Sequence, residues 1–229
     1  MKKKTIDELK QLSKKEKLDY YTNINDIISI NNGNTKTGSG CLTLSVPTSA
    51  CRSDAPCKKG CYCLKGRQLF AQVLGGYQRN LRIWNENHKD FEKQLFTTLS
   101  SATQKKFRWF DAGDIPDVDF LDLIFRTARK FPDISFLVYT KKYDMVNEYL
   151  DHHRIPSNLC VRFSMWDNTW SVPNPHNLPL SFVDFKDQTR NVSIPKNAFK
   201  CKGNNADITC TSCGVCFNKK VKNVVFKQH

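Results

Sequence analysis

The segment Phe107–Lys141, FRWFDAGDIPDVDFLDLIFRTARKFPDISFLVYTK, contains the pattern that decides the fold. Its first part, FRWFDAGDI, begins as an apolar strand and ends in polar residues, and DVDFLDLIFRTARKF then has the periodicity of an amphipathic helix. DISFLVYTK follows as another apolar strand with a polar end. A strand, a helix and a strand in this order predict two parallel strands joined by a crossover helix.

The same alternation continues on both sides of this segment. CLTLSVP (41–47) is typical of an earlier strand, and the chain from Arg67 to about Ser101 lacks proline and has helical periodicity. Further along, YDMVNEYLDHH predicts a helix, and NLCVRFSMW and LPLSFVDF predict two more strands. These units are too few for a closed eight-stranded barrel, so we expect an α/β fold built as a partial, incomplete parallel β/α barrel or an open sheet.

We expect three parts along the 229 residues, with one main domain. Residues 1–35 are a basic N-terminal helix, over residues 5–20, and a linker. Residues 36–195 form the partial barrel with a cysteine loop near its start. Residues 196–229 are a small cysteine-rich, metal-binding extension with a basic tail.

Polar residues follow the predicted strands at the points where the strands end. Asp111 and Asp114 follow one strand, Lys141 follows the next, and Ser164 ends the one after. In parallel α/β folds the carboxyl ends of the strands form the active face, so these residues are candidates for catalysis or substrate binding. Each residue taken alone also fits helix capping or turn formation.

The first cysteine set lies in CRSDAPCKKGCYCLKG, directly after the first predicted strand. Cys51, Cys57 and Cys61 are spaced C-x5-C-x3-C, and three thiolates would leave one iron of a 4Fe–4S cluster open. Cys63 is a reserve ligand. A zinc knuckle and a reactive thiol remain alternatives. Neighbouring cations would stabilise the thiolates and offset the cluster charge; they are Arg52, Lys58 and Lys59.

The second cysteine set is CTSCGVC near the C-terminus. Cys210, Cys213 and Cys216 have the C-x2-C-x2-C spacing of ferredoxin-type clusters, and Cys201 supplies a fourth thiolate. Four ligands make a closed site, and the spacing of the three cysteines favours an iron–sulfur cluster, with zinc as the alternative metal. The chain therefore predicts one or two clusters.

The composition limits compartment and partners. No run of about 18 apolar residues occurs, and the N-terminus lacks an apolar signal segment, so we expect a soluble cytoplasmic protein without membrane contact. A reducing compartment favours metal over disulfides for ten cysteines. The net charge of +14 favours nucleic acid or an acidic host protein as a partner, although a solvated lysine surface and compensation of an anionic cluster explain it equally well. No residue is singled out for nucleic acid, and no oligomeric state is indicated.

Two resemblances extend this interpretation. The three-cysteine loop, the helix after it and the strand ending in DAGDIP resemble the radical S-adenosylmethionine enzymes. This resemblance implies an open iron that binds S-adenosylmethionine, with Gly113 and Asp114 at the positions that contact its amino group. The chain is more closely similar to a phage-encoded family, gene product eighty-eight, in CRSDAPCKKGCYCLKG, FDAGD, FLVYTK, VRFSMW and CTSCGVCF. That similarity covers most of residues 36–217 and implies phage origin, metal content and the host-cell cytoplasm.

Two functions follow as hypotheses. In the first, the protein is an iron–sulfur protein and a radical-SAM-like redox enzyme, with an open cluster at the barrel mouth and a closed auxiliary cluster. In the second, it is a basic module that binds nucleic acid or a host factor, and its iron–sulfur or zinc sites are structural. Whether the chain is an enzyme stays open at this point, as do the substrate and the reaction.

Overall fold

The computed structural model describes residues 3–186, 190–203 and 208–228. Within these residues the centre of the fold is one mixed, mostly parallel sheet of eight strands in the order β1-β2-β3-β4-β5-β6-β8-β7. The strands are β1 (Ile30–Asn31), β2 (Cys41–Leu44), β3 (Lys106–Trp109), β4 (Ser135–Thr140), β5 (Leu159–Ser164), β6 (Leu180–Asp184), β7 (Phe199–Lys200) and β8 (Asn223–Lys227).

Only β1 runs antiparallel to its neighbour; β2 to β8 pair in parallel. The sheet is open, with β1 at one edge and β7 at the other. The prediction of an α/β fold with parallel strands is confirmed, and each of the five predicted strands corresponds to one of β2 to β6.

The described helices are α1 (Ile6–Gln11), α2 (Lys14–Asn23), α3 (Ala71–Glu86), α4 (His88–Ser100), α5 (Val118–Lys130), α6 (Tyr143–His152) and α7 (Cys210–Cys213). The single helix predicted over residues 5–20 is wrong, because the structure has two helices there. Leu12 is extended, and Ser13 accepts a hydrogen bond from the Glu16 amide and starts α2 with a capping box. A serine followed by a glutamate three residues later stabilises a new helix start.

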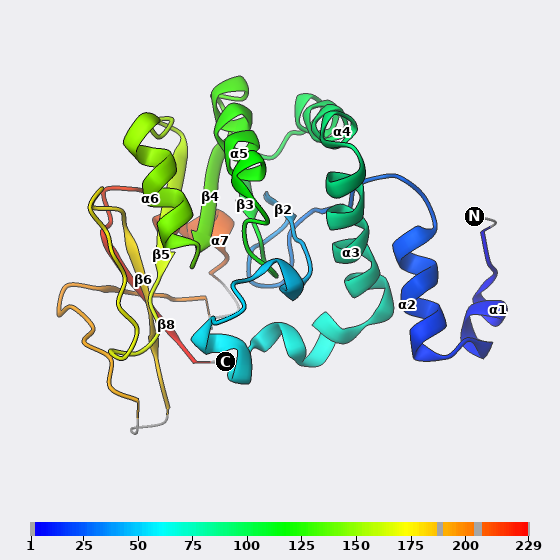
Figure 1. The fold of residues 1–229 in the computed structure, drawn as a ribbon, viewed down its shortest axis with the longest axis horizontal. Helices are drawn as coiled ribbons and strands as arrows, with labels where there is room; N and C mark the ends of the chain where they lie inside the picture. The colour runs from blue at the N-terminus through cyan, green and yellow to red at the C-terminus, as the bar shows by residue number, and fades with distance from the viewer. Residues whose placement is uncertain (1–2, 187–189, 204–207, 229) are drawn as a thin grey trace.

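Helix α3 runs straight through Gly75 and Gly76. A Cβ atom at Gly75 would lie 2.4 Å from the Cβ of Tyr21, so the glycine lets α2 pack closely on α3. Figure 1 shows α2 beside α3 and α1 beyond α2, at the end of the molecule away from β5 and β6. None of the helices in the described parts of the chain has the length and hydrophobicity needed to cross a membrane.

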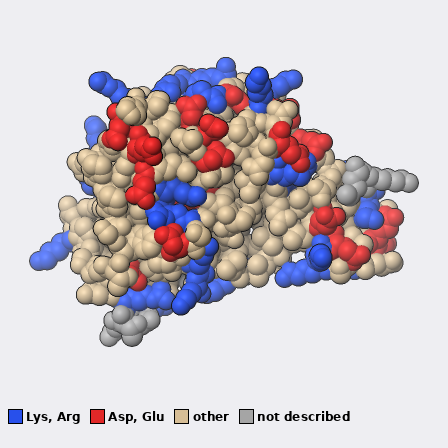
Figure 2. Space-filling model, viewed as in Figure 1, with Lys and Arg blue, Asp and Glu red and all other residues tan. Residues whose placement is uncertain are grey.

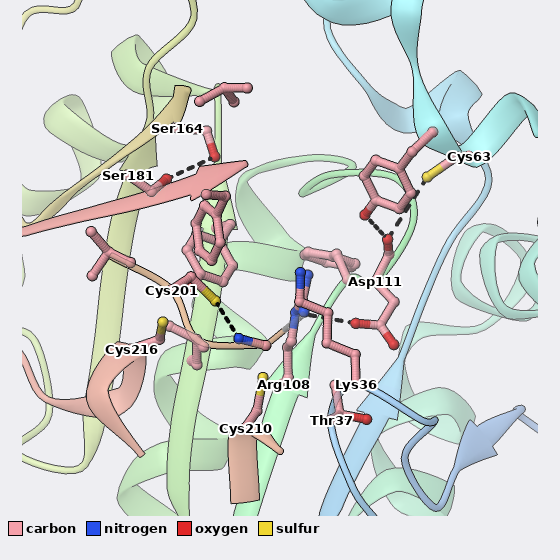
Figure 3. Close-up of a pocket in the computed structure, with 18 of the residues that line it drawn as sticks. Lys36, Thr37, Cys63, Arg108, Asp111, Ser164, Ser181, Cys201, Cys210 and Cys216 are labelled. Carbon is pink, nitrogen blue, oxygen red and sulfur yellow. Dashed lines mark hydrogen bonds and ion pairs between the residues drawn. The ribbon is translucent and has the colours of Figure 1, made fainter. Parts of the chain in front are cut away.

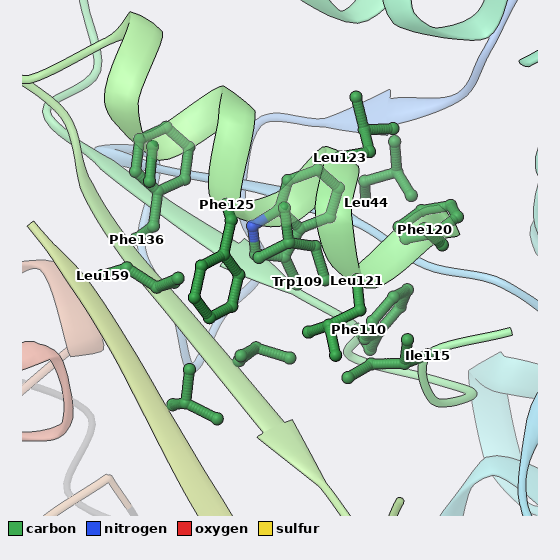
Figure 4. Packing of buried hydrophobic residues seen from close by; sticks show 14 of the residues in the cluster. Leu44, Trp109, Phe110, Ile115, Phe120, Leu121, Leu123, Phe125, Phe136 and Leu159 are labelled. Carbon is green, nitrogen blue, oxygen red and sulfur yellow. The ribbon is translucent and has the colours of Figure 1, made fainter. Parts of the chain in front are cut away.

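The main hydrophobic core lies on the face of the sheet that α5 covers. Phe107 and Trp109 of β3 point to this face and pack with Phe120 and Phe125 of α5, as Figure 4 shows for Trp109 and the helix. Because side chains alternate along a strand, the intervening residues of β3, β4 and β5 point to the opposite face. That second face carries Arg108, Tyr139, Arg162 and Ser164 and so differs in chemistry from the core face.

The C-terminal segment is part of the sheet. β8 lies between β6 and β7 and pairs with both, and its Val224 and Val225 are buried. Residues 204–207 and 229 of this predicted extension lie outside the described residues. The same segment therefore carries the second cysteine set and also a strand that the sequence analysis did not predict.

Candidate functional site

A cavity of about 640 Å³ lies against the polar face of the sheet and the carboxyl ends of its strands. All of the predicted site residues line it: Cys51, Cys57, Cys61, Cys63, Cys201, Cys210, Cys213, Cys216, Asp111, Gly113, Asp114, Lys141 and Ser164. Two cysteine sets that lie about 150 residues apart in sequence thus share one cavity with the strand-end residues. Their roles as ligands or as substrate-binding groups stay predictions.

The N-terminal cysteine loop is a series of short helical turns, Pro56–Gly60 and Tyr62–Leu64 among them. It is docked on the end of β3, because the Tyr62 hydroxyl donates to the Asp111 carbonyl and the Cys63 thiol approaches the same oxygen at 3.7 Å. Burial raises the pKa of Cys51 to about 12, and a hydrogen bond with Cys63 lowers the pKa of Cys61. The buried Cys63 thiol therefore has two neighbours, the Asp111 carbonyl and the Cys61 sulfur.

The sequence analysis predicts that three cations of this loop stabilise the thiolates, and that role stays a prediction. Arg52 pairs with Asp54 at 3.0 Å and with Asp144 at 3.3 Å, and it stacks on Trp170. The Lys58 ammonium donates to the Ser53 carbonyl at 2.9 Å. Neither of these residues, nor Lys59, lines the cavity, whereas Lys65 does. Arg52 and Lys58 are thus held by contacts with residues that lie outside the cavity wall.

Asp111 is held in place from three sides. Its carboxylate pairs with Arg108 Nε at 3.1 Å and accepts a hydrogen bond from Asn34 Nδ2 at 2.9 Å. Its backbone N–H donates to Ser45 Oγ at 3.0 Å. The residue before it, Phe110, has a φ of 60°, which is a strained conformation for a bulky residue. This bend at the end of β3 turns the chain, and Asp111 lies at the cavity wall directly after it.

Gly113 and Asp114 contact the protein itself. Gly113 has a φ of 81°, and a Cβ atom there would lie 2.4 Å from the Val46 carbonyl oxygen. The buried Asp114 carboxylate accepts hydrogen bonds from the amides of Lys141 (2.9 Å) and Ile115 (2.8 Å), and burial raises its pKa. Gly113 thus allows the close approach of the Val46 carbonyl, and Asp114 ties the ends of β3 and β4 together.

Lys141 and Ser164 also line the cavity. The Lys141 ammonium lies 5.9 Å from the centre of the Trp166 ring, and Ser164 Oγ lies 3.4 Å from Ser181 Oγ. Lys141 follows β4 and Ser164 ends β5, so both lie at carboxyl ends of strands and line the cavity, and Ser181 lies near the start of β6.

The C-terminal cysteine set is anchored by the N-terminal part of the chain. The amides of Cys210 and Thr211 donate to the carbonyls of Lys36 and Thr37, each at 3.0 Å, and the Lys106 ammonium donates to the Thr211 carbonyl at 2.6 Å. Gly214 then ends α7 with a φ of 65°. These contacts hold the short helix that carries Cys210 and Cys213 against β3.

The sequence analysis missed three residues beside these cysteines: Arg108, Tyr139 and Arg162, from β3, β4 and β5. Burial raises the pKa of Cys216, while a hydrogen bond with Tyr139 and the nearby Arg162 and Arg108 act to lower it. Figure 3 shows Arg108 and Asp111 between Cys63 on one side and Cys201, Cys210 and Cys216 on the other. A signal existed, since FRW and VRF each place an arginine inside an apolar strand, and buried arginines need anionic or carbonyl partners.

The cavity is suited to negative charge. Its described lining includes two carboxylates, those of Asp111 and Asp114, and six cationic side chains: Lys36, Lys65, Arg108, Lys141, Lys202 and Lys227. Thiolates and thiolate-bound clusters are anionic, and nearby cations favour them. In residues 3–186, 190–203 and 208–228, no three His, Cys, Asp or Glu side chains are arranged as ligands of a metal ion. The donor types and the charge around them fit an iron–sulfur cluster.

Three comparisons with known proteins complete the description of the chain. The family model described as "Gene product 88" matches residues 2–219. Curated proteins gave no match. Solved structures gave none either.

Proposed function

The chain belongs to the gene product 88 family, and from its cavity we propose that it is an iron–sulfur protein with two cysteine sets at one shared site. The observation that carries the proposal is the cavity wall itself. Eight cysteines, in two sets with ligand-like spacing, meet there in cationic surroundings. Such surroundings favour thiolates, which are the form that binds iron.

Each set has its own part in the proposal. Cys201, Cys210, Cys213 and Cys216 would hold a closed 4Fe–4S cluster, and Cys51, Cys57 and Cys61 would hold a second cluster with one open iron. The contact of the Cys63 thiol with the Asp111 carbonyl supports three ligands over four at the second cluster. When bound, such clusters supply one-electron chemistry. Zinc is the alternative metal at either set.

A more specific version of the proposal is that the protein is a radical-SAM-like enzyme built on a partial barrel. Three side chains of the cavity then bind a substrate. The Lys141 ammonium pairs with an anionic group, and the Ser164 hydroxyl forms a hydrogen bond. The Asp111 carboxylate, held beside Arg108, contacts a polar group of the substrate. S-Adenosylmethionine is the co-substrate that this form requires.

The test is anaerobic purification with iron, sulfide and zinc quantitation, in the wild type and in Cys210→Ser and Cys51→Ser variants. We expect iron and sulfide in equal amounts, and we expect each variant to lose only the share of its own set. Cys160→Ser is the matched control, because Cys160 is buried and outside both sets. Stoichiometric zinc without sulfide would contradict the iron–sulfur proposal.

The radical-SAM-like form has a separate test. We expect S-adenosylmethionine to shift the electron paramagnetic resonance signal of the reduced protein, both in the wild type and in Cys63→Ala. A signal that responds only after the loss of Cys63 would mean a closed four-cysteine site.

A second function is favoured by one surface, the exposed part of the N-terminal cysteine loop. Tyr62, Leu64 and Phe70 are 44%, 53% and 51% exposed. Exposed cations occur in the same loop, namely Lys58, Lys59, Lys65 and Arg67, and the sequence has no acidic residue between Asp54 and Glu86. Exposed aromatic side chains among cations suit single-stranded nucleic acid. Figure 2 shows basic and acidic side chains mixed over the face in view, so net charge alone defines no basic surface there.

This second function predicts salt-dependent binding of a single-stranded oligonucleotide. Phe70→Ala is expected to weaken binding, because a stacking ring is lost, whereas Ile27→Ala removes another exposed hydrophobic side chain, outside the loop, and is expected to have no effect. Affinity that is independent of salt, or equal in the two variants, would rule out this surface.

A further inference from the structure

Arg162 is a charged residue in the interior of the protein. It lies in the middle of β5, on the cavity face of the sheet, and its exposed fraction is 0%. A guanidinium stays protonated even when it is buried. The fold therefore contains a permanent positive charge at this point.

The partners of Arg162 all belong to one loop. Nε donates to the Cys216 carbonyl at 2.8 Å, and Nη2 donates to the carbonyls of Asn218 and Val221 at 2.9 and 2.8 Å. The guanidinium therefore joins β5 to the chain that leaves the second cysteine set. Without these bonds the three carbonyls would have to find other donors.

The charge of Arg162 is not balanced by a carboxylate in the part of the chain that the structure describes. Nη1 is buried and has no hydrogen-bond partner among the described residues. Burying a charge without a counter-charge is strongly unfavourable, because carbonyl dipoles replace only part of the lost hydration. The ionisable groups that Arg162 influences are the thiols of Cys216 and Cys160 and the hydroxyl of Tyr139.

We propose that Arg162 is the positioning residue of the second cysteine set, where it holds the Val215–Val221 loop on the sheet and supplies the positive charge that an anionic centre at Cys216 requires. The first part, the holding of the loop, depends only on the contacts of the protein. The second part rests on the proposed cluster. The loop is then ordered before metal binds, and the site accepts negative charge with little rearrangement.

Two substitutions at Arg162 distinguish the holding of the loop from the supply of positive charge. Arg162→Lys keeps the positive charge, but an ammonium cannot span three carbonyls as a guanidinium does. Arg162→Gln removes the charge as well as most of the hydrogen bonds. Arg154→Gln is the control, since Arg154 is exposed.

The first experiment uses the full chain, reduced and treated with a chelator, and measures amide hydrogen exchange. We expect exchange in Cys213–Val221 to increase by about tenfold or more in both Arg162 variants, because several hydrogen bonds to a charged group are lost, while α5 keeps its protection. Unchanged exchange in that loop would overturn the positioning role. If Arg162→Gln does not fold, Arg162→Lys alone decides this part.

The second experiment measures the midpoint potential of the cluster in full-length protein that carries Cys51→Ala, Cys57→Ala and Cys61→Ala, so that only the second set is loaded. We expect a lower potential in Arg162→Gln, since a nearby cation favours the reduced, more negative cluster, and a potential close to wild type in Arg162→Lys. Equal potentials in all three proteins would overturn the charge role. If the wild-type chain binds no cluster, the proposed function fails while the exchange result still decides the positioning role.

Discussion

At the scale of single residues, two neighbours at the end of β3 show how the cavity wall is built. Gly113 adopts a left-handed conformation and lets the Val46 carbonyl come close, and Asp114 turns its carboxylate to two backbone amides. Both residues join β3 to a neighbouring segment. The position of Asp111 at the cavity depends on this joint, because Asp111 lies two residues before Gly113.

Gly113→Ala should destabilise the protein. A non-glycine residue in this conformation costs about 1–3 kcal/mol, and the added Cβ atom also meets backbone. Gly60→Ala is the control, because nothing lies within 4 Å of a Cβ atom there. Urea denaturation measures the difference, and equal free energies of unfolding for the two variants would contradict the role of Gly113.

Asp114→Asn should also lower the free energy of unfolding, by about 1–3 kcal/mol, since the amide group keeps only one acceptor oxygen for two buried amides. Asp133→Asn changes an exposed carboxylate and serves as the control. The same denaturation experiment compares the two. A loss in Asp133→Asn as large as that in Asp114→Asn would indicate a general charge effect instead.

At the scale of elements, the two N-terminal helices differ in what they contribute. Helix α1 has no buried residue, whereas α2 buries Tyr20 and packs on α3 where Gly75 allows close approach. A capping box begins each of them, so their boundaries are set locally. The stability of each helix within the protein depends on the side chains that it buries. Helix α2 buries Tyr20, and α1 buries none.

Two truncations test this difference. Removal of residues 1–11 should change the free energy of unfolding by no more than about 0.5 kcal/mol, as for other changes at the surface. Removal of residues 1–23 should cost clearly more, because it uncovers the packed face of α3. Thermal and chemical denaturation of both truncated chains check the prediction, and equal losses would show that α1 and α2 act as one unit.

At the scale of the whole molecule, segments that are far apart in the sequence contact the central sheet and one another. β8 completes the sheet between β6 and β7, the Lys36–Thr37 segment holds α7, and Arg162 holds the loop after it. The cavity wall therefore combines residues of the segment 34–37, the ends of the strands and the described residues from Cys201 onward.

This arrangement predicts one cooperative unfolding transition. Native-state hydrogen exchange should give the amides of β8 a protection similar to that of β4, because β8 lies between two strands and cannot leave without opening the sheet. A C-terminal segment that exchanges orders of magnitude faster than β4 would mean that it is an independent extension.

The sequence by itself determined the alternation of helices and parallel strands from β2 to β6 and the positions of the two cysteine sets, because these rest on periodicity and spacing within short segments. It also identified the strand-end residues, because parallel strands end at a common edge. The family similarity stated from its motifs is confirmed.

Only the tertiary structure decided which partner each of these residues has. Three of these contacts join residues about 50 to 70 positions apart: Cys63 with Asp111, Val46 with Gly113, and Arg162 with the Cys216 carbonyl. The pairing of β8 with β6 joins strands about 40 positions apart. Local patterns carry no information about such pairs. They are set by the register of the sheet and by the need of each buried charge, amide and carbonyl for a partner.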